Sequence, residues 1–127
     1  MKTFDPAGYP VASFSQGAQG DPPLLFVAGQ VPRPPDGGAA AQAPEDQFRQ
    51  IWRNLIAVLD AAGASVEQLV QLRAFLSDRA HWDAFRSVRT EFLGEHRPAI
   101  TAVVCDLADP SWVAEIEAVA SLSDGAR

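Results

Sequence analysis

The fold is decided by the stretch VQLRAFL, residues 70–76, and by the segments on either side of it. Apolar and polar side chains alternate along this stretch, as they do in a strand with one buried face. Apolar residues recur at helical spacing over 45–62, before it, and over 80–94, after it. A strand between two helices predicts crossover connections and a sheet that is covered by helices.

Four further strands are expected, over residues 14–19, 24–30, 99–105 and 112–122. The predicted order is therefore β-β-α-β-α-β-β. This order indicates an α+β fold in which two helices pack on one face of a mixed sheet. The chain of 127 residues is long enough for one domain, and we expect a single domain over residues 1–127.

The other face of this sheet is expected to lack a covering layer. In the last strand, Ala114 and Ile116 belong to a small apolar face that must pack on the helices. The opposite face would carry Phe75, Val113 and Val119 among polar groups. Because an apolar surface of this kind rarely stays exposed, the sequence predicts oligomerisation through the bare sheet face.

Composition excludes several classes of function. A net charge of −6 argues against a nucleic-acid partner. The apolar run over residues 24–28 is too short to span a membrane, and no secretory signal is visible at the N-terminus. Cys105 is the only cysteine, so no internal disulfide is expected, and with two histidines it makes no zinc site. A cytoplasmic protein without a metal fits these features.

Glu115 and Glu117 are the first candidates for chemistry. They lie two residues apart on the last predicted strand, so their side chains point to the same face. Two carboxyl groups on one face can act as a general acid and base. They can equally be a solvated surface, and the local spacing leaves both interpretations open.

Two arginines and a glycine are further candidates. Arg89 lies beside the apolar stripe of the second helix, and Arg73 lies next to Phe75 on the face opposite Leu72. Each arginine could pair with a glutamate or hold a substrate carboxylate through two hydrogen bonds. Gly29 near the end of its strand indicates a close approach of the backbone to a neighbouring group.

Several short motifs resemble those of one family. FVAGQVP at 26–32 resembles its SGQ(I/V/L)P strand, and FLSD at 75–78 resembles its (F/Y)(L/V)xD turn. The helix end over 54–64, Pro98-Ala99, and EIEAVA at 115–120 match its remaining signatures in the same order. On these residues the chain is similar to the Rid family, the reactive-intermediate deaminases also called YjgF proteins.

The resemblance implies a chorismate-mutase-like (YjgF-type) fold, a homotrimer, and three clefts between subunits that take a small-molecule substrate. Deaminating members hydrolyse enamines and imines that pyridoxal-phosphate enzymes release, and they need no metal or cofactor. Their first glutamate of EIE, here Glu115, orients water or relays a proton. Their arginine after Pro-Ala holds the substrate carboxylate.

This sequence departs from the family at the proposed cleft. Ile100 replaces the arginine after Pro-Ala, and an isoleucine cannot bind a carboxylate. Phe14 replaces the tyrosine of the first strand, and Ala28 replaces the serine of SGQ. Arg89 stands where many members carry an asparagine of the site. We therefore expect a subgroup without the Pro-Ala-Arg arginine, in which the substrate has shifted.

Three functions follow as hypotheses. The first is an imine or enamine hydrolase with a more apolar or differently charged substrate. The second is a non-catalytic trimer that binds a small molecule or a protein. The third is the endoribonuclease activity attributed to some relatives, which the acidic charge disfavours.

Overall fold

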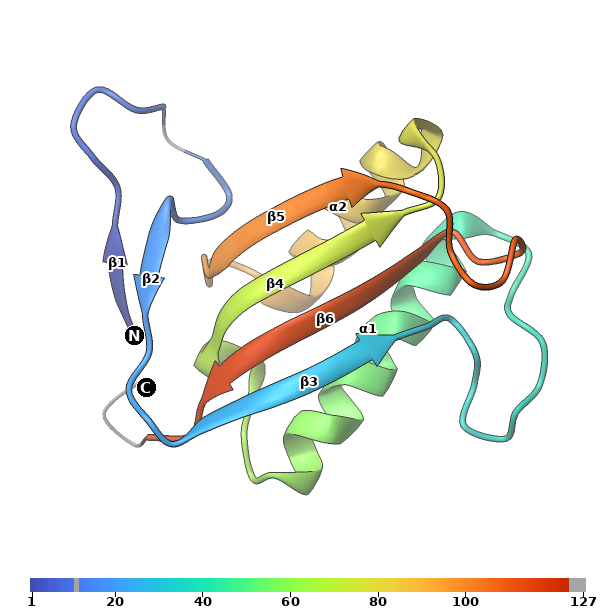
Figure 1. Cartoon of the computed structure of the whole chain (residues 1–127), viewed down its shortest axis with the longest axis horizontal. Helices are drawn as coiled ribbons and strands as arrows, with labels where there is room; N and C mark the ends of the chain where they lie inside the picture. The colour runs from blue at the N-terminus through green and yellow to red at the C-terminus, as the bar shows by residue number, and fades with distance from the viewer. Residues whose placement is uncertain (11, 124–127) are drawn as a thin grey trace.

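Two layers make up the fold in the computed structural model, which describes residues 1–10 and 12–123 (Figure 1). Four strands form a mixed sheet, and the helices α1 (Pro44–Ala61) and α2 (Trp82–Leu93) lie together on one face of it. The expected α+β fold, with two helices on one face of a mixed sheet, is confirmed.

The last strand of the chain lies inside the sheet rather than at its edge. The order across the sheet is β3 (Leu24–Gln30), β6 (Ala114–Ser121), β4 (Leu69–Leu76) and β5 (Ala99–Val104). β6 is antiparallel to both neighbours, and β4 is parallel to β5. The side chains of β6 therefore occupy the middle of both faces of the sheet.

The N-terminal segment forms a separate small sheet beside β5. β1 (Lys2–Phe4) pairs with β2 (Gly17–Gln19), and Figure 1 shows both beside the end of the sheet at which β5 begins. The strand expected over residues 14–19 thus begins later and joins β1 instead of the main sheet. One isolated bridge, from Ser15 to Ala99, ties this segment to β5.

Both helices begin and end where local chemistry favours it. Pro44 begins α1, and Gly63 just beyond its end has a φ of +73°, which suits glycine. A short 3-10 turn, η1 (Val66–Gln68), leads into β4, and a second, η2 (Arg79–His81), precedes α2. Asp78 caps this second turn by accepting a hydrogen bond from the Ala80 amide at 2.8 Å, and α2 starts after the turn, at Trp82.

The core lies between the helices and the sheet. Trp52 of α1 stacks on Phe92 of α2 with ring centroids 5.5 Å apart, and it is fully buried. Leu72 of β4 and Ile116 of β6 meet the helices from the sheet side. Burying each such side chain contributes about 1.5–3 kcal/mol, so this face holds the fold together.

One residue expected on the uncovered face lies in the core. Val113 is buried among the core side chains, and its amide donates to Gln47 Oε1 at 2.8 Å. β6 begins only at Ala114, so Val113 precedes the strand and does not follow its alternation. The prediction that Val113 contributes to the open face was wrong for this reason.

Candidate functional site

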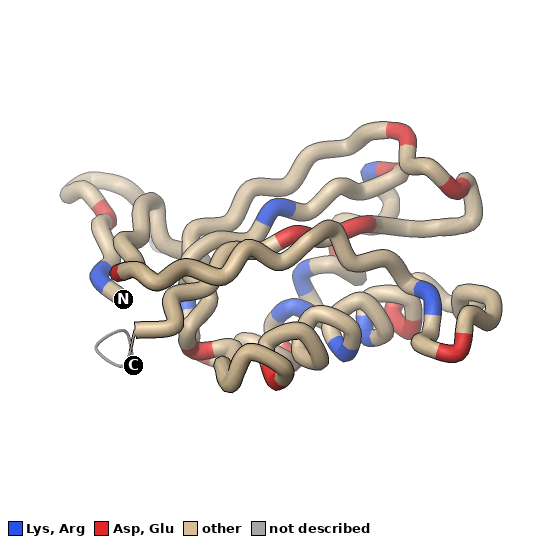
Figure 2. The backbone as a smooth tube through the Cα atoms, turned by 60° about the horizontal axis from the view of Figure 1, so that its bottom comes forward, with Lys and Arg blue, Asp and Glu red and all other residues tan. Residues whose placement is uncertain are grey.

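The uncovered face of the sheet carries little charge, and that charge is gathered at its centre. The four strands contain three charged residues, Arg73 on β4 and Glu115 and Glu117 on β6. Figure 2 shows the sheet as mostly uncharged, with the acidic and basic positions concentrated on the helices and loops. Phe26 on β3 and Phe75 on β4 flank the two glutamates on the same face.

The two glutamates have different surroundings. Arg73 lies opposite Glu117 in the β4–β6 register and binds it, with 3.0 Å between Nη2 and Oε2. Glu115 lies opposite Phe75, and within the described part of the chain its half-buried carboxylate has no hydrogen bond or ion pair. The structure thus gives Arg73 a glutamate partner of the same chain and leaves Glu115 available to another molecule.

Gly29 makes room for Glu115. The pairing of β3 with β6 shifts by one residue between Val27 and Gln30, which brings the backbone of β3 close to the Glu115 side chain. A Cβ atom at position 29 would overlap the Glu115 carboxyl group. The close backbone approach expected at Gly29 is present, and the group approached is the candidate catalytic carboxylate.

Phe14, Arg89 and Ile100 lie elsewhere, around the outer strand β5. Arg89 Nη2 donates to Ser13 Oγ at 2.6 Å, so the helix is tied to the segment next to Phe14. Phe14 lines a cavity of about 320 Å³ together with Tyr9 and Arg97. These residues belong to the edge of the molecule where the N-terminal segment meets β5.

Ile100 does not share a face with Glu115. It pairs with Leu72 across the β4–β5 register and packs against the core, on the side that faces the helices. The residues of β5 that share the open face are Ala99, Thr101 and Val103. Within one chain Ile100 and Glu115 therefore lie on opposite faces of the sheet, and the expected cleft between subunits stays a prediction.

The predicted site residues thus form two groups that a single chain keeps apart. Gly29 and Glu115 lie at β3 and β6, whereas Arg89 of α2 binds the N-terminal segment that contains Phe14 and meets β5. β4 separates β6 from β5, so the backbones of these two strands are roughly 9–10 Å apart. Neither group alone contains both a free carboxylate and a free guanidinium.

Ser13 is a partner of the candidate residue Arg89 that the sequence did not indicate. It lies 76 positions before Arg89, and no local motif marks a serine that will hold a guanidinium. The neighbouring Phe14 was recognised only through the family motif.

Within residues 1–10 and 12–123, no three His, Cys, Asp or Glu side chains lie close enough together to hold a metal ion. No helix in this part of the chain has both the length and the apolar character needed to cross a membrane.

Known proteins resemble this chain over nearly its whole length. Residues 5–122 match the family described as endoribonuclease L-PSP. A RutC family protein from Pyrococcus horikoshii is 33% identical over 112 residues, which are 87% of this chain and 88% of that protein. Protein HMF1 of Saccharomyces cerevisiae is 31% identical over 101 residues, 80% of this chain and 78% of its own.

A solved structure shows the same arrangement of elements. A Yersinia pestis protein of unknown function from the conserved Rid family matches with a TM-score of 0.80 and 28% identity. The match covers 95% of this chain and 98% of that one. Both groups of candidate site residues fall within the region that the family match covers.

Proposed function

The chain belongs to the Rid family, and from this premise we propose that it hydrolyses a small reactive imine or enamine. The observation that carries the proposal is the contrast between the two glutamates of β6. Glu117 is neutralised by Arg73, whereas Glu115 is half-buried beside Gly29 and has no partner in the described residues. A carboxyl group in that position is free to exchange protons with a bound substrate.

Glu115 suits both proton transfers of this reaction. Water adds to the carbon of the C=N bond, the nitrogen gains protons, and the C–N bond breaks to release ammonia and a carbonyl compound. The carboxylate of Glu115 takes a proton from the attacking water and returns it to the nitrogen. The reaction consumes only water, so atoms and electrons balance without an oxidant.

We further propose that the working form is a homotrimer with its clefts between subunits. The two separated groups of site residues support this, because one chain keeps them apart and a neighbouring copy can bring them together. The open face supports it too, since Phe26 is 73% exposed there. Sedimentation equilibrium tests this step: a monomer at micromolar concentration contradicts it.

The hydrolase activity is tested in an assay in which a second enzyme generates the imine in the same solution. An amino-acid dehydratase or oxidase forms the imine, and the rate of imine decay is followed with and without this protein. We expect faster decay for at least one imine, in proportion to the concentration of the protein. Decay at the buffer rate for every imine, from a protein confirmed to be trimeric, favours the non-catalytic binding trimer instead.

A further inference from the structure

Arg89 is a buried cation for which the described residues provide no anion. The residue is only 5% exposed, yet its one hydrogen bond in the described chain is the 2.6 Å bond to Ser13 Oγ. Its guanidinium carbon lies 5.1 Å from the centre of the Phe85 ring, a contact that adds attraction but no counter-charge. Buried charges in proteins are normally paired, so an unpaired one needs an explanation.

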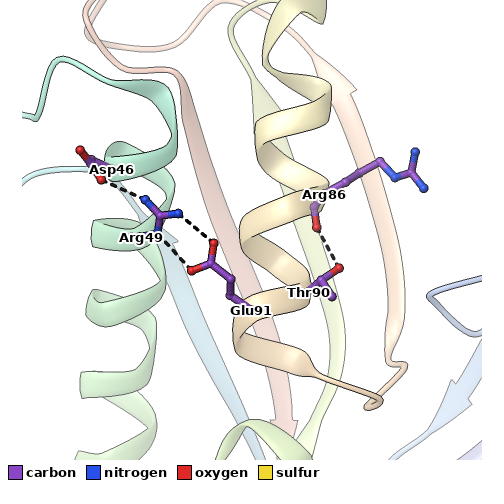
Figure 3. A network of polar contacts seen from close by, with 5 residues as sticks. All are labelled: Asp46, Arg49, Arg86, Thr90 and Glu91. Atoms are coloured by element: carbon purple, nitrogen blue, oxygen red, sulfur yellow. Dashed lines mark hydrogen bonds and ion pairs between the residues drawn. The ribbon is translucent and has the colours of Figure 1, made fainter.

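Arg49, in the same helix layer, differs from Arg89 because it forms ion pairs with carboxylates. It reaches from α1 to Glu91 on α2 at 2.9 Å and also contacts Asp46 at 3.0 Å (Figure 3). The bond to Glu91 is the main cause that raises the Arg49 pKa above its usual value. For Arg89 the direction is reversed, because burial, and then the charge of Arg86, lower its pKa.

The guanidinium of Arg89 has N–H donors that form no hydrogen bond with the described residues. It carries five N–H groups, of which the bond to Ser13 uses one. In the described residues, Trp52 Nε1 is the only fully buried side-chain nitrogen or oxygen without a partner. The unused N–H groups of Arg89 are therefore still reached by solvent, and an incoming anion can replace that water.

The neighbouring groups fit one small planar anion. Ser13 accepts from Arg89, so its hydroxyl hydrogen remains free to donate to a second oxygen. A guanidinium and a hydroxyl together match the two oxygens of a carboxylate. Ala12 and Phe14, on either side of Ser13, line the 320 Å³ cavity, which therefore adjoins the segment that Arg89 binds.

We propose that Arg89 and Ser13 bind the carboxylate of the ligand. This inference rests on the proposed function for the rest of the ligand, which would be the imine or the carbonyl product. A substrate with a carboxylate can then bind although Ile100 replaces the arginine after Pro-Ala. The cation that binds this carboxylate is Arg89 on α2, whereas the family's arginine would lie on β5. The anion is then held by Arg89 and Ser13 of one chain, and the proton-transferring Glu115 comes from the open sheet face of a second copy.

Binding is tested by calorimetry with 2-oxobutanoate and its uncharged amide as probes. We expect the wild-type protein to bind the acid and to bind the amide far more weakly. Arg89→Met should weaken binding of the acid by about 30-fold or more, because it removes one member of a buried charge pair. Arg89→Lys, which keeps the charge but loses the planar fork, should fall in between.

Arg86→Met is the matched control. Arg86 lies one turn earlier on α2, and its exposed side chain extends away from α1 (Figure 3). We expect its affinity for the acid to stay within about threefold of wild type, because an exposed charge contributes little. An equal loss of affinity in both variants would show a general charge effect and contradict the assignment.

Thermal unfolding separates a binding role from a structural one. Removing an unpaired buried charge should leave the melting temperature of Arg89→Met unchanged or raise it. A variant that melts lower or fails to fold, or that binds the acid normally, overturns the proposal, as does a wild type that binds neither probe. Failure of the hydrolase proposal is distinct, since it would appear as binding without turnover.

Discussion

The two faces of the sheet differ in how much of their apolar surface the chain itself buries. On the helix side Leu72 is 1% exposed and packs among buried side chains, whereas on the open side Phe26 is 73% exposed. The helix side is completed by the chain itself. The open side combines the exposed ring of Phe26 with the carboxylate of Glu115, which has no partner in the described residues, and this supports the proposal that another molecule covers it.

The largest predicted effect is a loss of turnover caused by a substitution on the open face. Glu115→Gln keeps the size of the side chain but removes its charge and its basicity, so turnover of an imine should fall by about 10²–10⁴-fold. Steady-state kinetics on an imine that the wild type hydrolyses gives the measurement. The trimer should remain intact by sedimentation, because the substitution adds no bulk.

Glu117→Gln is the control for that variant. It removes the partner of Arg73, and both side chains are partly exposed, so the main result should be a small loss of thermal stability. Full activity in Glu115→Gln would show that the site works through other groups. A loss of turnover in Glu117→Gln as large as in Glu115→Gln would remove the distinction between the two glutamates.

The next largest predicted effect is a loss of stability caused by a substitution on the face that packs against the helices. Leu72→Ala should lower the free energy of unfolding by about 2–5 kcal/mol, because it leaves a cavity in a packed core. Gln71→Ala, next to it on the strand but turned to the other face, should cost less than about 1 kcal/mol. Denaturant unfolding of both variants measures the difference, and equal losses would contradict the two-face description.

A smaller effect is expected on assembly. Phe26→Asp removes an aromatic side chain from the open face, whose burial contributes about 1.5–3 kcal/mol per copy. The variant should dissociate at protein concentrations where the wild type stays assembled, while its far-ultraviolet circular dichroism is unchanged. Unaltered assembly would place the subunit contact on another surface.

The smallest effect concerns the outer surface of the helices. The hydrogen bond from Arg49 is the main cause that holds the pKa of Glu91 below its ordinary 4.5. A carboxyl group with a lowered pKa in the folded state stabilises the fold above about pH 4.5, and this contribution is lost as the pH falls further. Glu91→Gln should therefore melt slightly below wild type at about pH 7, and the difference should shrink as the pH falls below about 4.5. A difference that persists in acid would point to packing instead of charge.

The periodic elements were predictable and their partners were not. Alternation over 70–76 and helical spacing over 45–62 placed a strand and a helix close to their observed bounds. The alternating pattern predicted the wrong face for Val113. β6 begins only at Ala114, the next residue, and the Val113 amide donates to Gln47 of α1 instead. The side of β5 to which Ile100 points followed only from its register with Leu72.

The sequence by itself determined the layers, because the burial of apolar side chains at a spacing of two or of 3.6 residues is a local pattern. It also determined that Glu115 and Glu117 share a face. Only the tertiary structure decided which of them is free, since Arg73, 44 residues away, is brought opposite Glu117. In the same way, only the packing of α2 against the N-terminal segment left Arg89 buried beside Ser13, with no counter-ion among the described residues. Pairing across a fold depends on register between distant segments, and no local spacing records it.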